Sequence, residues 1–373
     1  MRKKLGDFGF KVIVGVVALV IFASAIYYAN DGFQQPNSEQ HYHHETARVV
    51  QIIATDTEVT EGGFYSGEML LVVEIETGRY RGAHTEVIYF LNQVADLPLE
   101  VDDRVSIRMS AVANEITSIQ IQNLERRNAV FAFFAVFLLA LGLLGGKRGL
   151  VAVARLAFTL ICIIFLLIPL MLRGYPVLLT TFFILSLVTV VSLTFLAGLS
   201  TKGISAMIGC LIGVLTTALL TNVGGTVAHI SGFHMEEVGL IFATTDFPYA
   251  QATGLFISGV LIASLGAVMD TAVIIASTIH ELRKKNPKMT VGRLFRSGMN
   301  VGRDTMGTMT CTLILAFAGT SLNMIILIYS EGSSLNQLVN SDFMVIEIIR
   351  SVAGSLGIIL TIPAVAFVSC VMD

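Results

Sequence analysis

The stretch "GAVMDTAVII", residues 266–275, places one carboxylate, Asp270, in an otherwise apolar run. It lies within a longer apolar segment, residues 251–278, which is long enough to cross about 30 Å of hydrocarbon as a helix. An aspartate near the middle of a bilayer costs roughly 2.5–3.5 kcal/mol on insertion scales, so it is rare unless it is paired or used. The stretch therefore predicts a membrane helix and makes Asp270 the first candidate functional residue.

The composition extends this prediction to the whole chain. Of 373 residues, 54% are hydrophobic and 14% are charged, whereas a soluble domain has roughly 25% charged residues. We therefore expect an α-helical polytopic membrane bundle of about eight transmembrane helices. The apolar runs of spanning length are residues 10–28, 128–145, 150–172, 177–197, 203–221, 251–278, 305–329 and 344–368.

Basic residues predict the sidedness and the domain boundaries. Lys and Arg gather at residues 2–4, 147–148, 202 and 283–303, whereas residues 222–250 and 330–343 contain none. By the positive-inside rule, both termini are cytoplasmic and residues 30–127 lie outside. The first run resembles a signal peptide but has no clear cleavage site, so we expect residues 1–29 to remain as an anchor. Residues 128–373 then form a seven-span membrane domain.

Residues 30–127 have a different character. They hold 16 of the 27 acidic residues, all between Asp31 and Glu125, and none of the four cysteines. Short β-rich runs such as "ARVVQII", "EMLLVVEIE" and "RVSIRM" are separated by turn residues. Five or six such strands predict a small extracytoplasmic β-barrel-like domain, OB-like or SH3-like. Its acidity argues against a nucleic-acid partner and leaves the roles of structural cap or docking surface.

A histidine tract, "HYHHE", precedes these runs. His41, His43 and His44 lie close enough in sequence to hold a divalent metal such as Zn²⁺, Cu²⁺ or Ni²⁺. The alternative is a solvated spacer in a flexible linker. We expect no other cofactor.

Polar and small residues form stripes at helical spacing in the last three runs. Small residues allow helices to approach closely, so Asp270 is expected to face protein rather than lipid. The three faces together could line an interior path, although packing is the favoured explanation of such stripes when they are considered alone. An ion pair, for example Asp270 with Arg303, is the structural alternative for Asp270. Glu347 and Arg350, three residues apart, are expected to pair on one face of the last run. The stripes comprise Gly259, Ala263, Gly266, Ala267, Asp270 and Ser277; Asp304, Thr308, Cys311, Thr312, Gly319 and Asn323; and Glu347, Arg350, Gly354, Gly357 and Thr361.

Two connections between runs are predicted to be amphipathic. The basic segment 281–304 has apolar residues at helical spacing and is expected to lie on the inner membrane surface as a short helix, with docking of a partner as the alternative. The outer segment 232–250 is expected to form another.

Three motifs, "GAVMDTAVIIASTIHEL", "GRDTMGTMTCTLILAFAG" and "RSVAGSLGIILTIPAVA", taken together resemble the YibE/F-like family of bacterial membrane proteins. The resemblance runs from about residue 129 to the C-terminus. It implies a multi-pass protein of the bacterial plasma membrane. One departure is Cys311, where the family's equivalents usually have Asn.

Two classes of function follow from these features. The first is a secondary transporter or exporter, with Asp270 as a proton- or cation-coupling site and Asp304, Thr308, Asn323, Glu347 and Arg350 along the substrate pathway. The second is a membrane-anchored assembly or sensory protein whose outer β domain binds a partner. The chain lacks HExxH, GxSxG and P-loop motifs, so we expect it not to be an enzyme. Its expected partners are the lipid bilayer, a small molecule or ion as substrate, and a second copy or another membrane protein.

The topology gives a first prediction. In a cysteine-free background, cysteines placed in residues 30–127 or 330–343 should react with a membrane-impermeant maleimide on intact cells, because these segments lie outside. Lys284→Cys should react only after the membrane is permeabilised. Labelling of Lys284→Cys from outside would contradict the predicted orientation.

Overall fold

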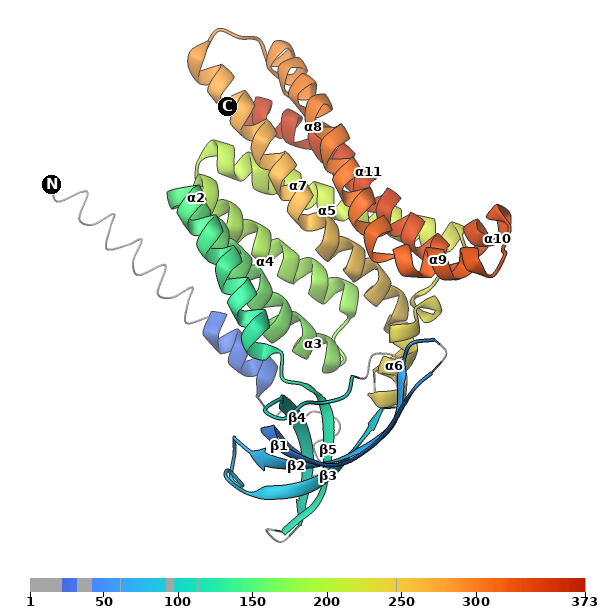
Figure 1. Ribbon diagram of the computed structural model, residues 1–373. Coiled ribbons are helices and arrows are strands. Elements are labelled where there is room, and N and C mark those ends of the chain that lie inside the picture. Colours follow the sequence, from blue (N-terminus) through green and yellow to red (C-terminus); the bar gives the residue numbers. More distant parts are fainter. Residues whose placement is uncertain are drawn as a thin grey trace, which may run out of the picture. The chain divides into compact units, whose positions relative to one another are not determined.

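The computed structural model describes residues 22–31, 42–60, 62–91, 97–112, 115–245 and 247–372 (Figure 1). Contacts divide the chain into two compact units, with boundaries at residues 33/34 and 146/147. Residues 34–146 hold the strands and are called here the β unit. Residues 147–373, together with the helix at residues 22–30, are called the helical unit.

The β unit is built on one antiparallel sheet with the order β3-β2-β1-β4-β5. The first half of β1 pairs with β4, and the second half pairs with β2. Because one long strand serves two neighbours in succession, and because register shifts interrupt its pairing with β2, the sheet curls into a half-barrel. The strands are β1 (Tyr42–Val59), β2 (Tyr65–Ile75), β3 (His84–Leu91), β4 (Arg104–Val112) and β5 (Glu115–Leu124).

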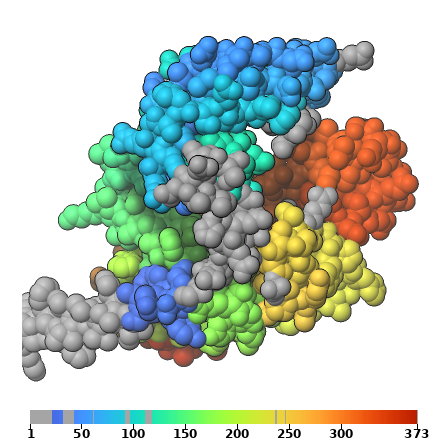
Figure 2. All heavy atoms as spheres, turned by 90° about the horizontal axis from the view of Figure 1, so that it is seen from below, coloured from blue at the N-terminus to red at the C-terminus, as the bar shows by residue number. Residues whose placement is uncertain are grey.

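Alternating side chains form the core of this sheet, as a strand period of two requires. In β2 the buried residues are Met69, Leu71, Val73 and Ile75, and their neighbours in sequence are more exposed. Figure 2 shows the outer atoms of β1–β3, coloured blue to cyan, as one continuous layer. The prediction of a β-rich module is confirmed, and among the described residues five strands form an open half-barrel.

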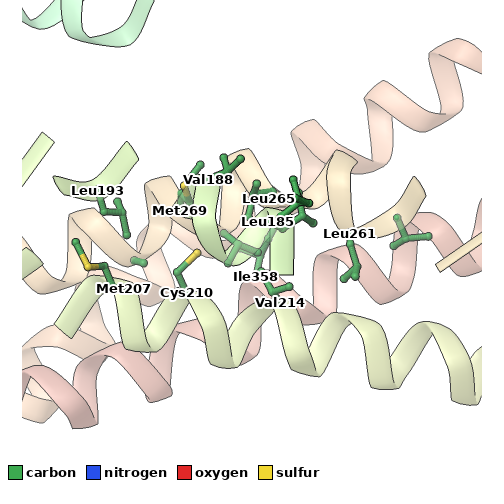
Figure 3. Packing of buried hydrophobic residues seen from close by; sticks show 14 of the residues in the cluster. Leu185, Val188, Leu193, Met207, Cys210, Val214, Leu261, Leu265, Met269 and Ile358 are labelled. Atoms are coloured by element: carbon green, nitrogen blue, oxygen red, sulfur yellow. The ribbon is translucent and has the colours of Figure 1, made fainter. Parts of the chain in front are cut away.

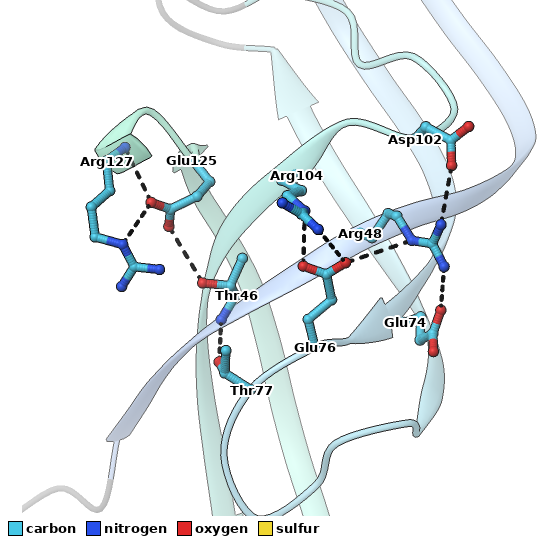
Figure 4. A network of polar contacts seen from close by, with 9 residues as sticks. All are labelled: Thr46, Arg48, Glu74, Glu76, Thr77, Asp102, Arg104, Glu125 and Arg127. Atoms are coloured by element: carbon cyan, nitrogen blue, oxygen red, sulfur yellow. Dashed lines mark hydrogen bonds and ion pairs between the residues drawn. The ribbon is translucent and has the colours of Figure 1, made fainter. Parts of the chain in front are cut away.

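Charged side chains tie the outer face of the sheet together (Figure 4). The Arg48 guanidinium lies 2.8 Å from Glu74 on β2 and 3.4 Å from Asp102, which precedes β4. Arg104 contacts Glu76 at 2.9 Å. The hydrogen bond from Arg48 holds the pKa of Glu74 below its usual range. The network links β1 to both of its neighbours on the solvated face.

The helical unit contains helices of very different lengths. A π-helical turn, η1 (Ile163–Leu167), joins its first two elements, and short 3₁₀ turns, η2 (Gly232–His234) and η3 (Tyr249–Gln251), flank α6. The helices are α2 (Arg127–Cys162), whose first part belongs to the β unit, α3 (Ile168–Leu172), α4 (Val177–Ala197), α5 (Thr201–Val227), α6 (Glu236–Thr244), α7 (Ala252–Lys285), α8 (Val291–Thr320), α9 (Leu322–Ser330), α10 (Leu335–Asn340) and α11 (Asp342–Met372).

Helices α4, α5, α7 and α11 enclose the apolar core of the helical unit. Figure 3 shows Cys210 and Val214 of α5 among side chains of α4 and α7, with Ile358 of α11 beside them. Cys210 and Ile358 are fully buried. These helices are apolar around much of their circumference, as expected for elements that meet protein on one side and lipid on the other.

Glycines allow α5 and α11 to approach closely. A Cβ atom on Gly357 of α11 would collide with Thr217 of α5, and one on Gly213 of α5 would collide with Thr361 of α11. Each glycine therefore receives a threonine of the opposite helix, in a reciprocal interlock. Close backbone approach at small residues is the usual basis of helix association in membranes.

The membrane prediction is confirmed in its coarse form. Five helices of the described residues are long and apolar enough to cross a membrane, and six if the bent pair α8–α9 counts as one span. Helix α4 has the predicted bounds of 177–197. The predicted turn between runs two and three coincides with a break at Gly146, whose φ is 53°. Most of residues 10–28 lies outside the described residues, so the total of eight stays a prediction.

The prediction of a separate surface helix within residues 281–304 is wrong. Helix α7 continues to Lys285, and α8 begins at Val291 and runs on without interruption. Leu294 is fully buried, and Gly298 packs so closely that a Cβ atom there would lie 2.7 Å from Ile279 of α7. The apolar stripe predicted to contact lipid instead packs against the bundle. The other connection predicted to be amphipathic, segment 232–250, does form short helices, η2, α6 and η3.

The interlock predicts a contrast between two glycines. Gly357→Ala places a methyl group against Thr217 and should lower the apparent melting temperature of the detergent-purified chain, since overpacking costs roughly 1–3 kcal/mol. Gly266→Ala is the matched control, because Gly266 lies in a helix and a methyl group added to it would have no neighbouring atom within 4 Å. It should leave the melting temperature unchanged or raise it. Equal losses for the two variants would contradict the interlock.

Candidate functional site

A cavity of about 520 Å³ lies where α8, α9 and α11 meet the segment that precedes α6. It is called here the Glu347 cavity. Its wall combines apolar side chains with two carboxylates, one guanidinium and one imidazole. The lining residues are His234, Met235, Thr320, Ser321, Met324, Asp342, Phe343, Ile346, Glu347 and Arg350.

An ion pair forms the charged part of this wall. Arg350 donates to Glu347 over 2.6 Å, three residues apart on the same face of α11. The two side chains are only 22% and 11% exposed. Glu347 Oε2 and Arg350 Nε are buried and have no hydrogen-bond partner among the described residues. The pair is therefore largely shielded, and the protein leaves part of its hydrogen-bonding capacity unused.

Arg350 also connects three parts of the bundle. Its second terminal nitrogen lies 3.4 Å from the thioether sulfur of Met235, next to α6. Its guanidinium lies 5.9 Å from the ring centroid of Phe256 on α7, within the range of a cation–π contact. From its position on α11, the Arg350 side chain therefore contacts both α7 and the segment before α6.

The apolar helical segment next to the cavity is bent. Helices α8 and α9 meet at Ser321 with a bend of 55°. Ser321 is 4% exposed and lines the cavity together with Thr320. A break in a membrane helix frees main-chain carbonyl and amide groups, and such groups are tolerated where they border a cavity.

Of the three predicted stripes, the one on α11 is buried inside the bundle. Glu347, Gly354, Gly357 and Thr361 of α11 are buried, and Arg350 is partly buried beside them. Gly354 lies against Leu313 of α8 and Ser264 of α7. The predicted pairing of Glu347 with Arg350 is confirmed.

Asp270, which is expected to face protein rather than lipid, is not covered by its own chain. Asp270, Gly259, Ala263 and Gly266 lie on the exposed face of α7. The buried face carries larger side chains such as Leu261, Leu265 and Val268. The spacing identified the small face correctly, but in this bundle the large apolar face is the one that packs against α5 and α11.

The predicted partner of Asp270 is wrong. Arg303 donates instead to Asn300 at 3.5 Å. The cation whose charge acts on Asp270 is Arg155 of α2, although the two do not form an ion pair within 4 Å.

The α8 stripe is not part of an interior path within one chain. Asp304, Thr308, Cys311, Thr312, Gly319 and Asn323 are all exposed. The Thr308 and Thr312 hydroxyls donate to carbonyls of their own helix, at 2.9 and 2.8 Å. None of these residues lines the Glu347 cavity. At the end of α8, the residues that line it are Thr320 and Ser321.

The histidine tract is not a loose linker where it can be followed. His43 and His44 belong to β1 and pair with Met109 and Arg108 of β4. Because they are neighbours in a strand, their side chains point to opposite faces of the sheet. In this arrangement His43 and His44 do not face the same ion. His41 lies outside the described residues. No cluster of three or more metal-ligating side chains occurs in the parts of the chain that the structure describes.

Comparison with known proteins gives the chain a family. The family model described as "YibE/F-like protein" matches residues 133–372, more than half of the chain. The chain belongs to the YibE/F-like family. Neither the curated proteins nor the solved structures compared with it gave a match. The match covers the helices that line the Glu347 cavity, and family membership and the apolar helices together identify a membrane protein.

Several cavity residues of this YibE/F-like chain are not distinguished by the sequence. Met235, Met324 and Phe343 look like ordinary apolar residues, and Ser321 like one more small residue in a run. Asp342 falls in a predicted outer loop, whereas it begins α11 and lines the cavity. The available signal is the sequence "AGTSLN", in which small and polar residues interrupt the seventh apolar run.

The ion pair gives the prediction for this site. Glu347→Gln and Arg350→Met should each lower folded yield and melting temperature, because each leaves a largely buried charge without its partner, a change that costs roughly 3–5 kcal/mol in buried pairs. The double variant should recover most of that loss. As a control, Glu74→Gln and Arg48→Met remove a more exposed pair of the β unit and should change the melting temperature less. Additive losses at Glu347 and Arg350 would show that the two charges act independently.

Proposed function

We propose that this YibE/F-like protein is a secondary transporter whose solute occupies the Glu347 cavity. The observation that carries the proposal is a largely buried ion pair in the wall of a cavity beside a broken membrane helix. Ionisable residues in membrane bundles are uncommon and usually serve transport or conduction. Carriers often form their substrate sites from interrupted helices, whose free main-chain groups contact the solute.

Asp270 is proposed as the site that couples this transport to a proton or another cation. Its carboxylate has no hydrogen bond or ion pair among the described residues, and Arg155 supplies a nearby positive charge. A carboxylate in such a setting changes its proton affinity when the cation moves toward it or away. Relative movement of α2 and α7 would then load and release the ion. We propose no catalytic role for any residue.

The proposed setting is the bacterial plasma membrane, with both termini in the cytoplasm and residues 30–127 outside. The distribution of Lys and Arg supports this orientation. The second candidate function is a membrane-anchored assembly or sensory protein. It is favoured by the β unit, which forms its own compact unit with its own apolar core.

Proteoliposomes test the transport proposal directly. An imposed membrane potential should drive proton flux, followed with an internal pH dye, in vesicles that contain the wild-type chain. Asp270→Asn should abolish that flux while expression and melting temperature stay normal, because the substitution keeps the volume and removes the charge. The matched control, Glu281→Gln, alters an exposed carboxylate at the end of the same helix and should retain wild-type flux.

Three other results would decide against coupling. Wild-type flux in Asp270→Asn would show that the carboxylate takes no part in ion movement. Loss of folding in Asp270→Asn, with Glu281→Gln intact, would show that Asp270 is a structural residue. Absence of flux from the wild-type chain would remove proton coupling and favour the assembly or sensory function.

A further inference from the structure

The outer face of α8 is polar between residues 303 and 312. Every exposed residue of this segment is charged, polar or small, and none is a large apolar residue. The opposite face packs against the bundle, where Gly302 and Leu313 are buried. The exposed residues, called here the α8 polar face, are Arg303, Asp304, Gly307, Thr308, Cys311 and Thr312.

The α8 polar face lies beside an apolar part of α11. A Cβ atom on Gly302 of α8 would collide with Ile362 of α11, and one on Gly354 of α11 would lie 2.9 Å from Leu313 of α8. The segment between Gly302 and Leu313 thus runs along residues 354–362. These belong to residues 351–372 of α11, which contain no charged residue and are long enough to cross about 30 Å of hydrocarbon. The α8 polar face is therefore level with the apolar part of its neighbour.

Exposed faces elsewhere in the helical unit are different. Helix α4, which is long and apolar enough to cross a membrane, exposes Leu179, Phe183 and Phe195 at 58%, 67% and 58%. Large apolar side chains suit contact with lipid tails. Ionisable side chains at membrane depth almost always face protein or a water-filled cavity instead. The α8 polar face is therefore unsuited to lipid.

We propose that a second copy of the chain covers the α8 polar face, with α8 of one copy packed against α8 of the other. The proposal concerns the association of copies in the membrane and does not depend on transport.

The rest of the same chain does not supply this cover. Helix α8 packs against α7 and α11 with its opposite face. The β unit carries ion-paired charged side chains on its surface, which keep it out of hydrocarbon. The helix at residues 22–30 begins elsewhere, with the Phe22 ring 5.2 Å from that of Phe158 on α2. The cover therefore comes from another molecule.

The charges on the face favour a second copy over an unrelated partner. Arg303 and Asp304 are adjacent, exposed and opposite in sign, and Asp304 forms no hydrogen bond or ion pair among the described residues. Arg303 donates only to the neutral side chain of Asn300 in that part of the chain. In a two-fold symmetric contact every residue pair occurs twice. Arg303 of each copy can thus pair with Asp304 of the other, which neutralises all four charges.

The same face allows two helices to approach closely. Gly307 and Cys311 are one turn apart, and small residues at that spacing are typical of helix pairs in membranes. A methyl group added to Gly307 would have no neighbouring atom within 4 Å, so its own chain leaves this position open.

Symmetry places Cys311 at the middle of the contact. Two copies inserted in the same orientation are related by an axis along the membrane normal, so a residue at the centre of the face meets its own equivalent. With 3.6 residues per turn, Arg303 and Thr312 lie on either side of Cys311 around the helix. The Cys311 thiols of the two copies should therefore lie close together.

Cys311 makes the contact measurable, because the other three cysteines of the chain, Cys162, Cys210 and Cys370, are buried. The full-length wild-type chain is placed in liposomes at a low protein-to-lipid ratio and oxidised with copper phenanthroline, which enters the bilayer. We expect a covalent dimer on non-reducing electrophoresis, joined through Cys311 in its peptide map.

The matched control moves the exposed thiol to the face of α4. The double variant Cys311→Ser, Phe183→Cys should give at least roughly tenfold less dimer, because a disulfide requires Cα atoms within about 7 Å of each other. Phe183 is suitable because its side chain is exposed on a helix that is expected to face lipid.

Charge variants test the pairing without any cross-link. The copies in each liposome are counted by stepwise photobleaching of a fluorescent label at the C-terminus, and the wild type should be mainly dimeric. Asp304→Arg should weaken dimerisation at least roughly tenfold, because like charges then meet across the contact. Arg303→Asp combined with Asp304→Arg exchanges the charges, restores both pairs and should recover the dimer. Asp304→Asn, which keeps the volume, should weaken dimerisation less and replaces Asp304→Arg if that variant does not fold.

Three results would overturn the proposal. Single bleaching steps from the wild type would show that the chain is monomeric and that another protein or water covers the face. Equal yields of covalent dimer from the wild type and the Phe183→Cys control would mean random collision. Equal weakening by Asp304→Arg and by the charge exchange would show that Arg303 and Asp304 do not pair between copies.

Discussion

The reciprocal fit of glycine and threonine between α5 and α11 is the constraint on which the helical unit depends. Lipid tails are as apolar as the side chains of a membrane helix, so the hydrophobic effect does not drive helices together in a bilayer. The helices associate instead through close packing. Gly213 receives Thr361 and Gly357 receives Thr217, which sets the distance between the two helix axes. The Thr361 hydroxyl donates to the carbonyl of Gly357, 2.7 Å away, and the Thr217 hydroxyl donates to the carbonyl of Gly213, 2.9 Å away. Both hydroxyls in the contact are thereby satisfied within their own helices.

The position of the Glu347 cavity follows from this contact. With α11 held against α5, its charged turn at Glu347 and Arg350 reaches the region where α8 breaks at Ser321. Paired charges are tolerated in such a position because each neutralises the other's field. Asp270 differs, since it lies on the open face of α7 and is near a cation with which it forms no ion pair. The two acidic sites of the bundle therefore have different electrostatic roles.

The β unit differs from the helical unit in the charged side chains on its surface. Its outer face carries an exposed charge network around Arg48, which water and salt screen. Its core is formed by apolar side chains that alternate along the strands, such as Leu71 and Val73 of β2, which are fully buried. The two units are therefore stabilised in different ways, by close packing of helices in one and by the buried face of a sheet in the other.

The sequence by itself determined the class of each unit. Length and apolarity predicted the membrane helices, and α4 even has its predicted bounds, because hydrocarbon thickness dictates how many apolar residues a span needs. Alternation predicted the strands, and spacing along one helix predicted the Glu347–Arg350 pair. These are local properties, which depend on the geometry of a single element.

Only the tertiary structure decided which face of each helix is covered. The stripes of α7, α8 and α11 have the same pattern in sequence, yet only that of α11 is buried. The apolar residues of segment 281–304 gave no sign that they begin α8 and pack against α7. A pattern of small and large side chains fixes the faces of a helix, but the neighbour that fits a face comes from distant parts of the chain. The Glu347 cavity, made by residues from 234 to 350, is the result of that long-range choice.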